Sequence, residues 1–351
     1  RPAVDWTGFS GGIRAAKWNS LIEDKFFPMP NRAAASQYPP GSTFKIVVAL
    51  AALAEGVITP ETEFHCSGSL KLGDGTFGCH SRYGHGAVNL KRSLKVSCDV
   101  YYYEVGLRLG VDRLARAARE FFNLGSKVGI ELPAEAAGRI PDRAWKMARY
   151  KKRWMIGETL PVSIGQGAVA CSPLQVAMFT AAVANGGYFY RPHLVKEIID
   201  VDGKVVKRIE PELLNRIEVT PEQLKAVQDG LEAVVGEEGG TGRRAAIPGL
   251  RISGKTGTSQ VISNKSFKET RYDNRDHAWF TSYAPSDNPE VVVTVILEHT
   301  GGGGTYAAPV AKSLLAAYFD KTVVAESIPP AQVQPDLAAG FTRDEVVEST
   351  D

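Results

Sequence analysis

Ser42 and Lys45 stand three residues apart, a spacing that brings a serine hydroxyl and a lysine amine onto one face of a helix. A serine is a useful nucleophile only beside a base, and lysine can be that base when burial lowers its pKa. At a helix N-terminus, Ser42 would also lie among free backbone N–H groups that favour a developing anion. The pair therefore suggests nucleophilic catalysis, although alone it is better explained as a helix-capping serine and a surface lysine.

A second segment, Ser97-Cys98-Asp99, places a hydroxyl and a carboxylate two residues apart near a predicted helix. Both groups could take part in proton transfer. Taken alone, this segment also fits a helix cap better than a catalytic site.

A third segment, Lys255-Thr256-Gly257-Thr258, has the pattern of a strand. Thr256 and Thr258 would face one side, where two hydroxyls can bind a carboxylate, while Lys255 and Gly257 face the other. Gly257 would let another backbone approach the strand, and Lys255 would supply a fixed positive charge. The alternative is a glycine-rich edge strand with an exposed lysine.

Three of the four cysteines lie close together in the sequence and could bind a metal. Cys66, Cys79, His85 and Cys98 have the spacing C-x12-C-x5-H-x12-C, and three thiolates with one imidazole make a tetrahedral zinc set. Bound zinc would hold Ser97 and Asp99 in place from behind.

A disulfide or free thiols could also account for these cysteines. Cys66 and Cys79 could form a disulfide with Cys98 free, or all three could be buried thiols. His80 is a second possible ligand with a less favourable spacing. We expect Cys171, which stands apart, to be a buried apolar side chain.

Composition excludes several classes of protein. The chain has 351 residues with 41 basic and 39 acidic side chains, and a net charge of +2 argues against nucleic-acid binding. Four cysteines are too few for a disulfide scaffold. The longest apolar run, Ile46–Ala54, is nine residues, far short of the roughly 20 that a membrane helix needs. No signal peptide is recognisable at the first residues.

The pattern of elements predicts an α+β fold. We expect a buried central helix over 43–55, a helix from Leu90 past Tyr103, and mostly loop over 133–172. The run 291–297 is continuously apolar and β-branched, as in a buried central strand. Further predicted helices cover 111–123, 173–185, 221–235 and 308–319, and further strands 193–200, 204–209, 250–259 and 277–284.

In this order and spacing, the three segments resemble the S-x-x-K, S-x-N/D and K-T-G motifs of penicillin-binding proteins and serine β-lactamases. The sequence around Ser42, from Tyr38 to Lys45, and that of 163–175 are similar to class B penicillin-binding proteins. Asn185-Gly186-Gly187 and His277-Ala278-Trp279-Phe280 match them too. Residues 83–86 and an aspartate at position 99, often asparagine in the family, resemble the elongation type.

The resemblance implies a transpeptidase fold, with an antiparallel sheet, flanking helices and an all-α subdomain. We expect the transpeptidase domain over 1–325, mainly helical over 56–190 and mainly sheet with its helices over 191–325, followed by a loose tail over 326–351. The family's first core strands, pedestal domain and membrane anchor are expected outside this chain.

The resemblance also implies roles for the motif residues. Ser42 would attack a D-Ala-D-Ala stem peptide, Lys45 would accept its proton, and Ser97 would relay a proton to the leaving amine beside Lys255. Backbone N–H groups of Ser42 and Thr258 would form the oxyanion hole. The remaining implied site residues are Thr256 and Thr258 on the substrate carboxylate, Gly257 on the same strand, and Asp99.

The implied function is peptidoglycan D,D-transpeptidation during cell-wall elongation, at the periplasmic face of a bacterial inner membrane. Catalysis would need no cofactor, and β-lactams would acylate the serine. A polytopic glycosyltransferase and a periplasmic scaffold are the implied partners. The alternatives are a D,D-carboxypeptidase, a β-lactamase-like hydrolase, or a penicillin-binding sensor or scaffold.

Overall fold

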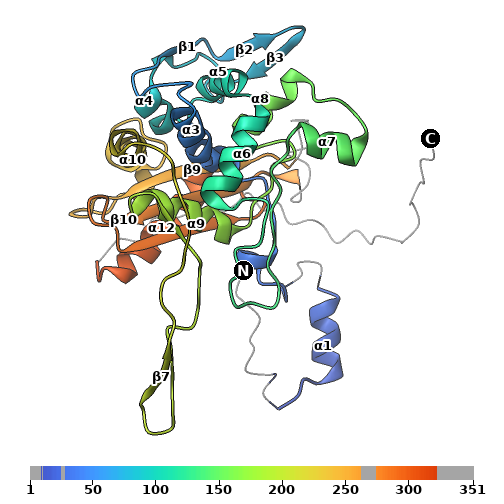
Figure 1. Ribbon diagram of the computed structural model, residues 1–351, viewed down its shortest axis with the longest axis vertical. Coiled ribbons are helices and arrows are strands. Elements are labelled where there is room, and N and C mark those ends of the chain that lie inside the picture. The colour runs from blue at the N-terminus through green and yellow to red at the C-terminus, as the bar shows by residue number, and fades with distance from the viewer. Residues whose placement is uncertain (1–8, 10, 25–27, 262–273, 322–351) are drawn as a thin grey trace, which may run out of the picture.

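An antiparallel sheet of three strands runs through the middle of this computed structural model, which describes residues 9, 11–24, 28–261 and 274–321 (Figure 1). The strands are β9 (Ser253–Ser259), β10 (His277–Ala284) and β11 (Val291–Leu297), in the order β11-β10-β9. All three confirm strands predicted from the sequence. The predicted tail over 326–351 lies outside the described residues.

The prediction that 291–297 is a buried central strand is wrong within the part of the chain that the structure describes. β11 pairs only with β10 there, and six of its seven residues are half-buried rather than buried. The central strand is β10, which is buried throughout. β11 is continuously apolar because α9 (Pro173–Ala184) and α12 (Gly303–Tyr318) both contact it.

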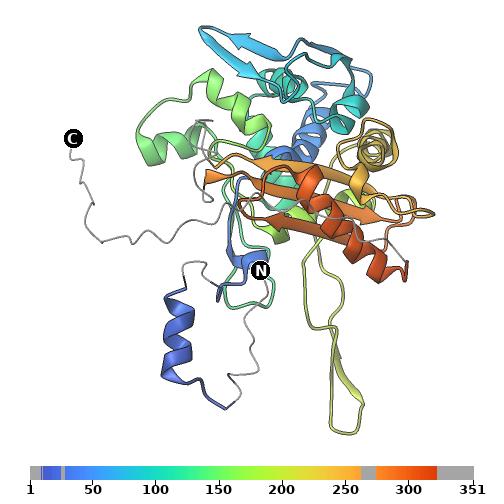
Figure 2. The ribbon, with the colours of Figure 1, turned by 180° about the vertical axis from the view of Figure 1, so that it is seen from behind.

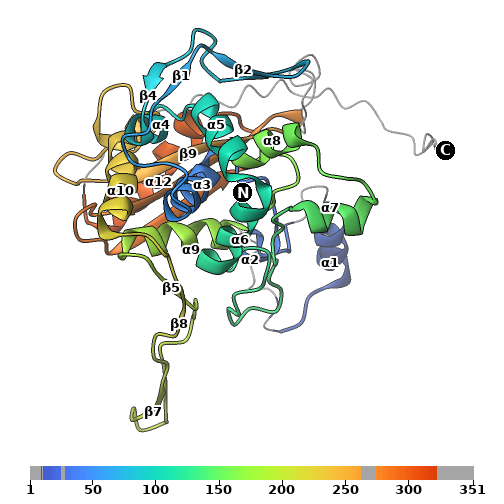
Figure 3. The same ribbon diagram turned by 45° about the horizontal axis from the view of Figure 1, so that its top comes forward.

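Helices cover both faces of the sheet (Figures 2 and 3). On one face, Ala278 and Phe280 of β10 share an apolar cluster with α12. On the other face, Trp279 and Tyr283 belong to the larger core of the helical region. There the hydroxyl of Thr281 lies 2.8 Å from that of Thr180 on α9, so a buried polar pair is satisfied across the layers.

The predicted central helix is confirmed. A 3-10 turn, η2 (Gly41–Phe44), leads into α3 (Lys45–Ala54), where every residue from Lys45 to Leu53 is buried. Small and aliphatic side chains on all sides let other elements contact α3 around its whole circumference. Gly56, at φ +62°, reverses the chain after it.

The helix predicted from Leu90 past Tyr103 is two helices. They are α4 (Leu90–Lys95) and α5 (Asp99–Leu109), and they are separated at Ser97, which has a left-handed φ of +54°. A single left-handed residue cannot continue an α-helix, so the chain turns sharply there. The helix predicted over 111–123 is confirmed as α6 (Val111–Phe122).

Within the region expected to be mainly helical, residues 64–88 form four short strands. β1 (Phe64–Cys66) pairs with β4 (Gly86–Val88), and β2 (Ser69–Leu72) pairs with β3 (Gly75–Gly78). A Cβ on Gly84 would lie 2.1 Å from the Cys66 carbonyl oxygen, so only glycine allows this crossing. The crossing brings Cys66 and His85 together, since the His85 backbone N–H donates to the Cys66 carbonyl oxygen at 3.0 Å, and the Cys79 backbone N–H donates to that of Gly68 at 2.8 Å.

The region 133–172, expected to be mostly loop, contains three helical segments. They are α7 (Arg143–Tyr150), η3 (Ile156–Glu158) and α8 (Thr159–Ser163). Trp145 N–H donates to the Asp142 carboxylate at 2.7 Å, an N-cap that the sequence pattern did not reveal.

A long arm projects from the body of the molecule and ends in a hairpin of β6 (Glu197–Ile199) and β7 (Val205–Arg208) (Figure 1). Its Asp202-Gly203 turn was predicted. The remaining elements are α1 (Ala15–Ile22), α2 (Arg32–Ala35), β5 (Tyr188–Tyr190), β8 (Leu213–Arg216), α10 (Pro221–Gly236) and η4 (Arg243–Ala245). No helix among the described residues has the length and apolar character that a membrane crossing requires.

Candidate active site

Ser42 lies in η2, one turn before the buried helix α3. It is partly exposed, whereas Gly41, Thr43 and Phe44 around it are buried, so its side chain is the one this turn presents to solvent. The turn lies directly against β9. A Cβ on Gly41 would be 2.5 Å from the Thr258 carbonyl oxygen, and the backbone at Gly41 has a φ of +54°. The glycine at position 41 therefore allows η2, and with it Ser42, to lie this close to the K-T-G strand.

Lys45, at the start of α3, reaches away from solvent and is completely buried. Its Nζ donates to the Ser97 carbonyl oxygen at 2.9 Å and contacts the Ser97 Oγ at 3.3 Å. It also lies 2.7 Å from Asp99 Oδ1. The first and second motifs therefore meet through a single buried amine.

Lys255 approaches the same hydroxyl from the sheet. Its Nζ donates to Ser97 Oγ at 2.9 Å and to the Thr256 carbonyl oxygen at 3.1 Å. Burial, reinforced by the nearby charge of Lys45, holds the pKa of Lys255 well below its usual value, and Asp99 opposes this. Ser97 Oγ is thus shared by two lysines, one on each side of the site.

Asp99 connects the lysines to the segment that carries the cysteines. Burial alone would raise the pKa of its carboxyl group, but the charge of Lys45 and the hydrogen bond with His80 outweigh burial and hold that pKa far below its usual range. The His80 backbone N–H donates to Asp99 Oδ2 at 3.0 Å, and the imidazole Nδ1 of His80 lies 3.6 Å from the same oxygen. This interaction of the imidazole with Asp99, with a second contribution from Cys79, raises the pKa of His80 to about 9.

The third motif presents backbone as well as side chains. Gln166 Nε2 donates to the Thr258 carbonyl oxygen at 3.0 Å, so this carbonyl points away from β10. In a strand the N–H and C=O of one residue point to the same edge, so the Thr258 N–H also faces the free edge beside η2. Thr256 Oγ1 lies 2.8 Å from Thr241 Oγ1.

Two of these contacts were not expected from the sequence. Gln166 was noted only as part of a family segment, and nothing in the sequence singled out Thr241. Both contacts join segments far apart along the chain, so only the tertiary structure reveals them. His80, considered as an alternative ligand, lies 3.8 Å from Cys79 Sγ and, with Cys79 and Asp99, forms a second group of possible metal ligands.

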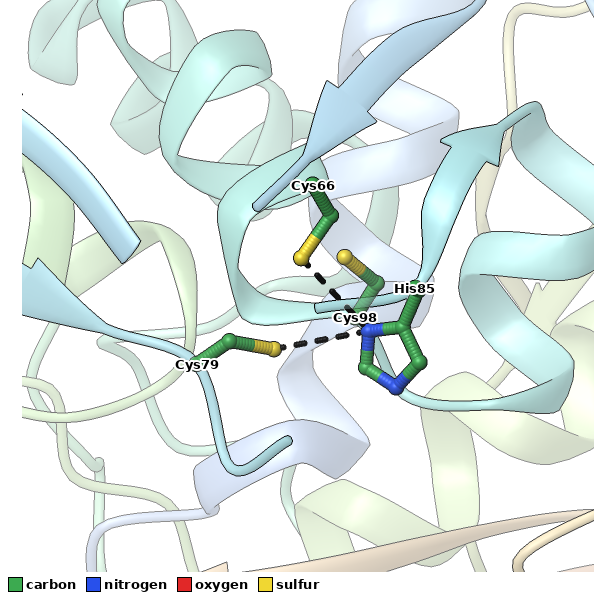
Figure 4. Close-up of side chains that lie close together, drawn as sticks. All are labelled: Cys66, Cys79, His85 and Cys98. Atoms are coloured by element: carbon green, nitrogen blue, oxygen red, sulfur yellow. Dashed lines mark hydrogen bonds between the residues drawn. The ribbon is translucent and has the colours of Figure 1, made fainter. Parts of the chain in front are cut away.

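The four predicted metal ligands come together (Figure 4), and one of them, Cys98, stands between Ser97 and Asp99 in the chain. The ligand atoms of Cys66, Cys79, His85 and Cys98 all lie within 4.8 Å of one another. His85 Nδ1 is 3.6 Å from the sulfur of Cys66 and 3.6 Å from that of Cys79. The thiols are free in this structure, without the alternative Cys66–Cys79 disulfide.

The cluster is joined to the site by one peptide unit. The Asp99 N–H donates to Cys79 Sγ at 3.4 Å, and Asp99 directly follows Cys98. A hydrogen bond with Cys98 lowers the pKa of Cys79 to about 3, and the same bond raises that of Cys98. Cys171 is fully buried away from this cluster, as predicted.

This fold and constellation are those of a known class. The chain belongs to the family of penicillin-binding protein transpeptidase domains, which matches residues 9–316. The family and fold expected from the motifs are confirmed.

Among its relatives, the peptidoglycan D,D-transpeptidase MrdA of Haemophilus influenzae is 39% identical over 349 residues, which cover 96% of this chain and 53% of that protein. MrdA of Escherichia coli K12 is 34% identical over 311 residues, covering 86% and 49%. The chain thus spans about half the length of these curated relatives.

Solved structures are similar as well. Penicillin-binding protein PBP2 of Pseudomonas aeruginosa, in complex with WCK 5153, gives a TM-score of 0.79 at 35% identity, covering 91% of this chain and 69% of that one. PBP2 of Helicobacter pylori, in complex with MreC, gives 0.77 at 32% identity, covering 89% and 55%. These likenesses agree with the expected elongation type.

Proposed function

We propose that this chain is the catalytic domain of a peptidoglycan D,D-transpeptidase that crosslinks stem peptides during cell-wall elongation. The observation that carries the proposal is the position of Ser97 Oγ, 2.9 Å from Lys255 Nζ and 3.3 Å from Lys45 Nζ. A hydroxyl held between two amines can pass a proton from one side of a site to the other. The names of the curated relatives support the same reaction.

In the proposed reaction, Ser42 Oγ bonds to the carbonyl carbon of the penultimate D-Ala. Lys45 takes up the Ser42 proton as it releases one of its own to Ser97 Oγ, and Ser97 gives a proton to the nitrogen of the departing D-Ala as the peptide bond breaks. An amine of a second stem peptide then attacks the acyl-serine, releases Ser42 and forms the crosslink.

Backbone and side chains of the two motif segments would stabilise the intermediate. The N–H groups of Ser42 and Thr258 would donate to the oxyanion, since η2 and the free edge of β9 lie side by side. Thr256 and Thr258 would bind the terminal carboxylate. Gly257 allows this approach, because a Cβ there would lie 3.0 Å from the Pro40 carbonyl oxygen.

Labelling with a fluorescent penicillin tests the proposal. The parent chain should form a long-lived covalent adduct, Ser42→Ala should form none, and Ser313→Ala, on the exposed surface of α12, should label like the parent. Labelling of Ser42→Ala would refute the nucleophile assignment. Rapid release of hydrolysed drug would favour the hydrolase alternative. Labelling without crosslinking of stem peptides would favour a sensor.

The same proposal places the protein at the periplasmic face of a bacterial inner membrane, beside a polytopic glycosyltransferase and a periplasmic scaffold. Its support comes from relatives: one solved structure is a PBP2–MreC complex, and another is described as a peptidoglycan synthase complex that coordinates polymerization and crosslinking.

We also propose that Cys66, Cys79, His85 and Cys98 hold a structural zinc ion. Tetrahedral zinc with sulfur and nitrogen ligands separates its ligand atoms by about 3.5–3.8 Å, and the two sulfur-to-Nδ1 distances of 3.6 Å fit this value. Bound zinc would fix the peptide that carries Ser97 and Asp99, while the chemistry remains with the serine and the lysines.

Native and denaturing mass spectrometry of one metal-free-buffer preparation tests the zinc site. The expected result is one zinc per chain, lost on denaturation, with all cysteines reduced. His85→Gln should abolish binding and His80→Gln should retain it, whereas the opposite result would assign the metal to the group of Cys79, His80 and Asp99. A mass two hydrogens light without metal would establish the disulfide and refute the zinc proposal.

A further inference from the structure

A strongly basic segment lies at and after α7, in a chain whose overall charge is nearly balanced. Between Asp142 and Glu158 there is no acidic residue. The same stretch carries six cations: Arg143, Lys146, Arg149, Lys151, Lys152 and Arg153. Positive charge is therefore concentrated in this segment, whereas the whole protein has 41 basic and 39 acidic residues.

Two of the six cations have internal partners. Arg143 lies 3.3 Å from Asp112, and Lys146 pairs with Glu158. The other four, Arg149, Lys151, Lys152 and Arg153, are exposed and make no ion pair with the residues that the structure describes. Like charges so close together repel each other unless an anion neutralises them.

Aromatic rings alternate with these cations. Trp145 and Tyr150 meet edge to face with centroids 5.6 Å apart, and Tyr150 is 53% exposed. The Arg149 guanidinium carbon lies 5.6 Å from the Tyr150 ring, and that of Arg139 lies 5.7 Å from the Trp145 ring. Such stacking holds flat, rigid faces towards solvent with little loss of side-chain entropy.

This surface is connected to the candidate active site through one short helix. Trp154 Nε1 donates to Thr159 Oγ1 at 2.9 Å, and Thr159 begins α8. Just after α8, Gln166 contacts the Thr258 carbonyl oxygen on the edge of β9. α7 and α8 lie on the same side of the helical region (Figure 1). These contacts link the segment that follows α7 to the segment that lies against β9.

We propose that the α7 surface, defined as Trp145, Arg149, Tyr150, Lys152 and Arg153, binds a carboxylate-bearing polysaccharide alongside the active site. The inference rests on the proposed function, because the ligand would be the uncleaved part of the same cell-wall polymer. Sugar rings present apolar C–H faces that stack on aromatic rings. The carboxylates of attached peptides pair with guanidinium and ammonium groups.

An anionic lipid surface is the competing ligand, since cations and aromatic residues also favour membrane interfaces. α7 has only eight residues, and alanines occupy two positions of its apolar face, Ala144 and Ala148 beside Met147. Met155 and Ile156, just after the four cations, are exposed as well, at 66% and 63%. These few apolar side chains make a small apolar area for a membrane to bury, whereas stacked rings and four cations without ion pairs suit a charged polysaccharide. We therefore favour the polysaccharide.

The test compares two triple variants with the same change in charge. One replaces the α7 cations, Arg149→Gln, Lys152→Gln and Arg153→Gln. The control replaces three exposed lysines of the β6–β7 arm, Lys196→Gln, Lys204→Gln and Lys207→Gln. Each protein is sedimented with purified insoluble peptidoglycan at low salt and at about 0.5 M NaCl, and is also labelled with fluorescent penicillin.

We expect the α7 triple variant to bind peptidoglycan about tenfold more weakly, with a smaller dependence on salt. Its rate of acylation should stay within about twofold of the parent rate, because the substituted side chains touch no motif residue. The control triple variant should bind like the parent. Tyr150→Ala, which keeps every cation, should weaken binding severalfold and thereby report the stacking contribution.

Three outcomes would overturn the inference. Equal losses in both triple variants would mean unspecific charge attraction, and unchanged binding in the α7 variants would mean that the surface has no such ligand. Weaker binding of the α7 triple to vesicles of phosphatidylglycerol, with unchanged binding to peptidoglycan, would establish the lipid. Failure of the proposed function looks different, because the parent itself would then not be acylated by penicillin, would release hydrolysed drug rapidly, or would not crosslink stem peptides.

Discussion

The Nζ of Lys45 and the Oδ1 of Asp99 lie 2.7 Å apart, with the lysine side chain completely buried. The second oxygen of Asp99 accepts a hydrogen bond from the backbone N–H of His80. An uncharged amide at position 99 would balance no charge, whereas the carboxylate neutralises a buried ammonium and ties α3 to the cysteine-bearing segment. Aspartate in place of the family's frequent asparagine thus has a structural reason in this chain.

Asp99→Asn should reduce both stability and acylation. Loss of the counter-charge of a buried ammonium should lower the free energy of unfolding by about 2–4 kcal/mol, less than a complete truncation because the amide oxygen can still accept a hydrogen bond. Acylation by penicillin should slow by about 10- to 100-fold. Stopped-flow labelling and urea unfolding measure the two effects.

The matched control is Glu104→Gln, on the same helix, α5, and outside the hydrogen bonds that join the motif residues. It should change neither quantity by more than about 0.5 kcal/mol or twofold. If Asp99→Asn behaved like this control, the ion pair with Lys45 would not matter to the site.

Ser97 combines a shared hydroxyl with a left-handed backbone, at φ +54°. Ser97→Ala and Ser97→Gly both remove the hydroxyl that contacts Lys45 and Lys255, so each should reduce acylation by at least about 100-fold. They should differ in stability. Glycine adopts this backbone without strain, and Ser97→Gly should be about 1 kcal/mol more stable than Ser97→Ala.

The comparison of these two variants separates the hydroxyl from the backbone. Acylation restored by glycine but not alanine would show that the turn, and not the Oγ, is what catalysis needs. Denaturant unfolding of both variants alongside labelling is therefore the necessary measurement.

The sequence was sufficient to bring the three motifs together, because each motif is local. The S-x-x-K segment spans the 3-10 turn η2 and the first residue of α3, and Lys255 belongs to one strand with a regular pattern. The structure places Lys45, Ser97, Asp99 and Lys255 in one hydrogen-bonded group. The spacing of the four ligand candidates suggested a metal site but left a disulfide or free thiols open, and the structure brings their ligand atoms within 4.8 Å of one another.

Three features depend on tertiary structure and could not be predicted from the sequence. The break at Ser97 interrupts a good helical pattern, and no residue there is a glycine or proline. The contacts of Thr241 and Gln166 depend on loops meeting β9. Whether β11 is central or at an edge depends on which strands pair, and an apolar run between two helical layers looks the same in both cases.

Substituting Gly41 and Gly56 would separate the effect of a steric clash from that of backbone strain. Gly41 and Gly56 both have positive φ values, +54° and +62°, but a Cβ on Gly41 would be 2.5 Å from the Thr258 carbonyl oxygen whereas Gly56 has no atom within 4 Å. Gly41→Ala should therefore cost about 2–4 kcal/mol and abolish acylation by displacing Ser42 from β9. Gly56→Ala should cost only about 1 kcal/mol.

Thermal unfolding and penicillin labelling of the two variants check this prediction. Gly56→Ala should acylate at the parent rate, since it introduces the same backbone strain without moving η2. Equal activity of the two variants would show that the contact between η2 and β9 does not position the nucleophile.

His277, at the start of β10, should make stability depend on pH. Burial, together with the neighbouring His299, lowers the pKa of His277 to about 4, against the weaker influence of Glu298 and Asp276. Its Nδ1 accepts the His299 N–H at 3.1 Å, which requires that nitrogen to be unprotonated, and its ring meets Tyr38 edge to face. The folded protein therefore holds the neutral imidazole.

The protein should become less stable as pH falls from about 6.5, the pKa of an unfolded histidine, to about 4. In this window the unfolded chain binds one more proton at His277 than the folded chain does. The contribution of His277 is complete above about pH 6.5 and amounts to about 1–3 kcal/mol.

Urea unfolding at a series of pH values measures this contribution. His277→Gln, which cannot titrate, should flatten the profile in this window, whereas His193→Gln, on the exposed arm, should keep it. An unchanged slope in His277→Gln would assign the acid sensitivity to other groups.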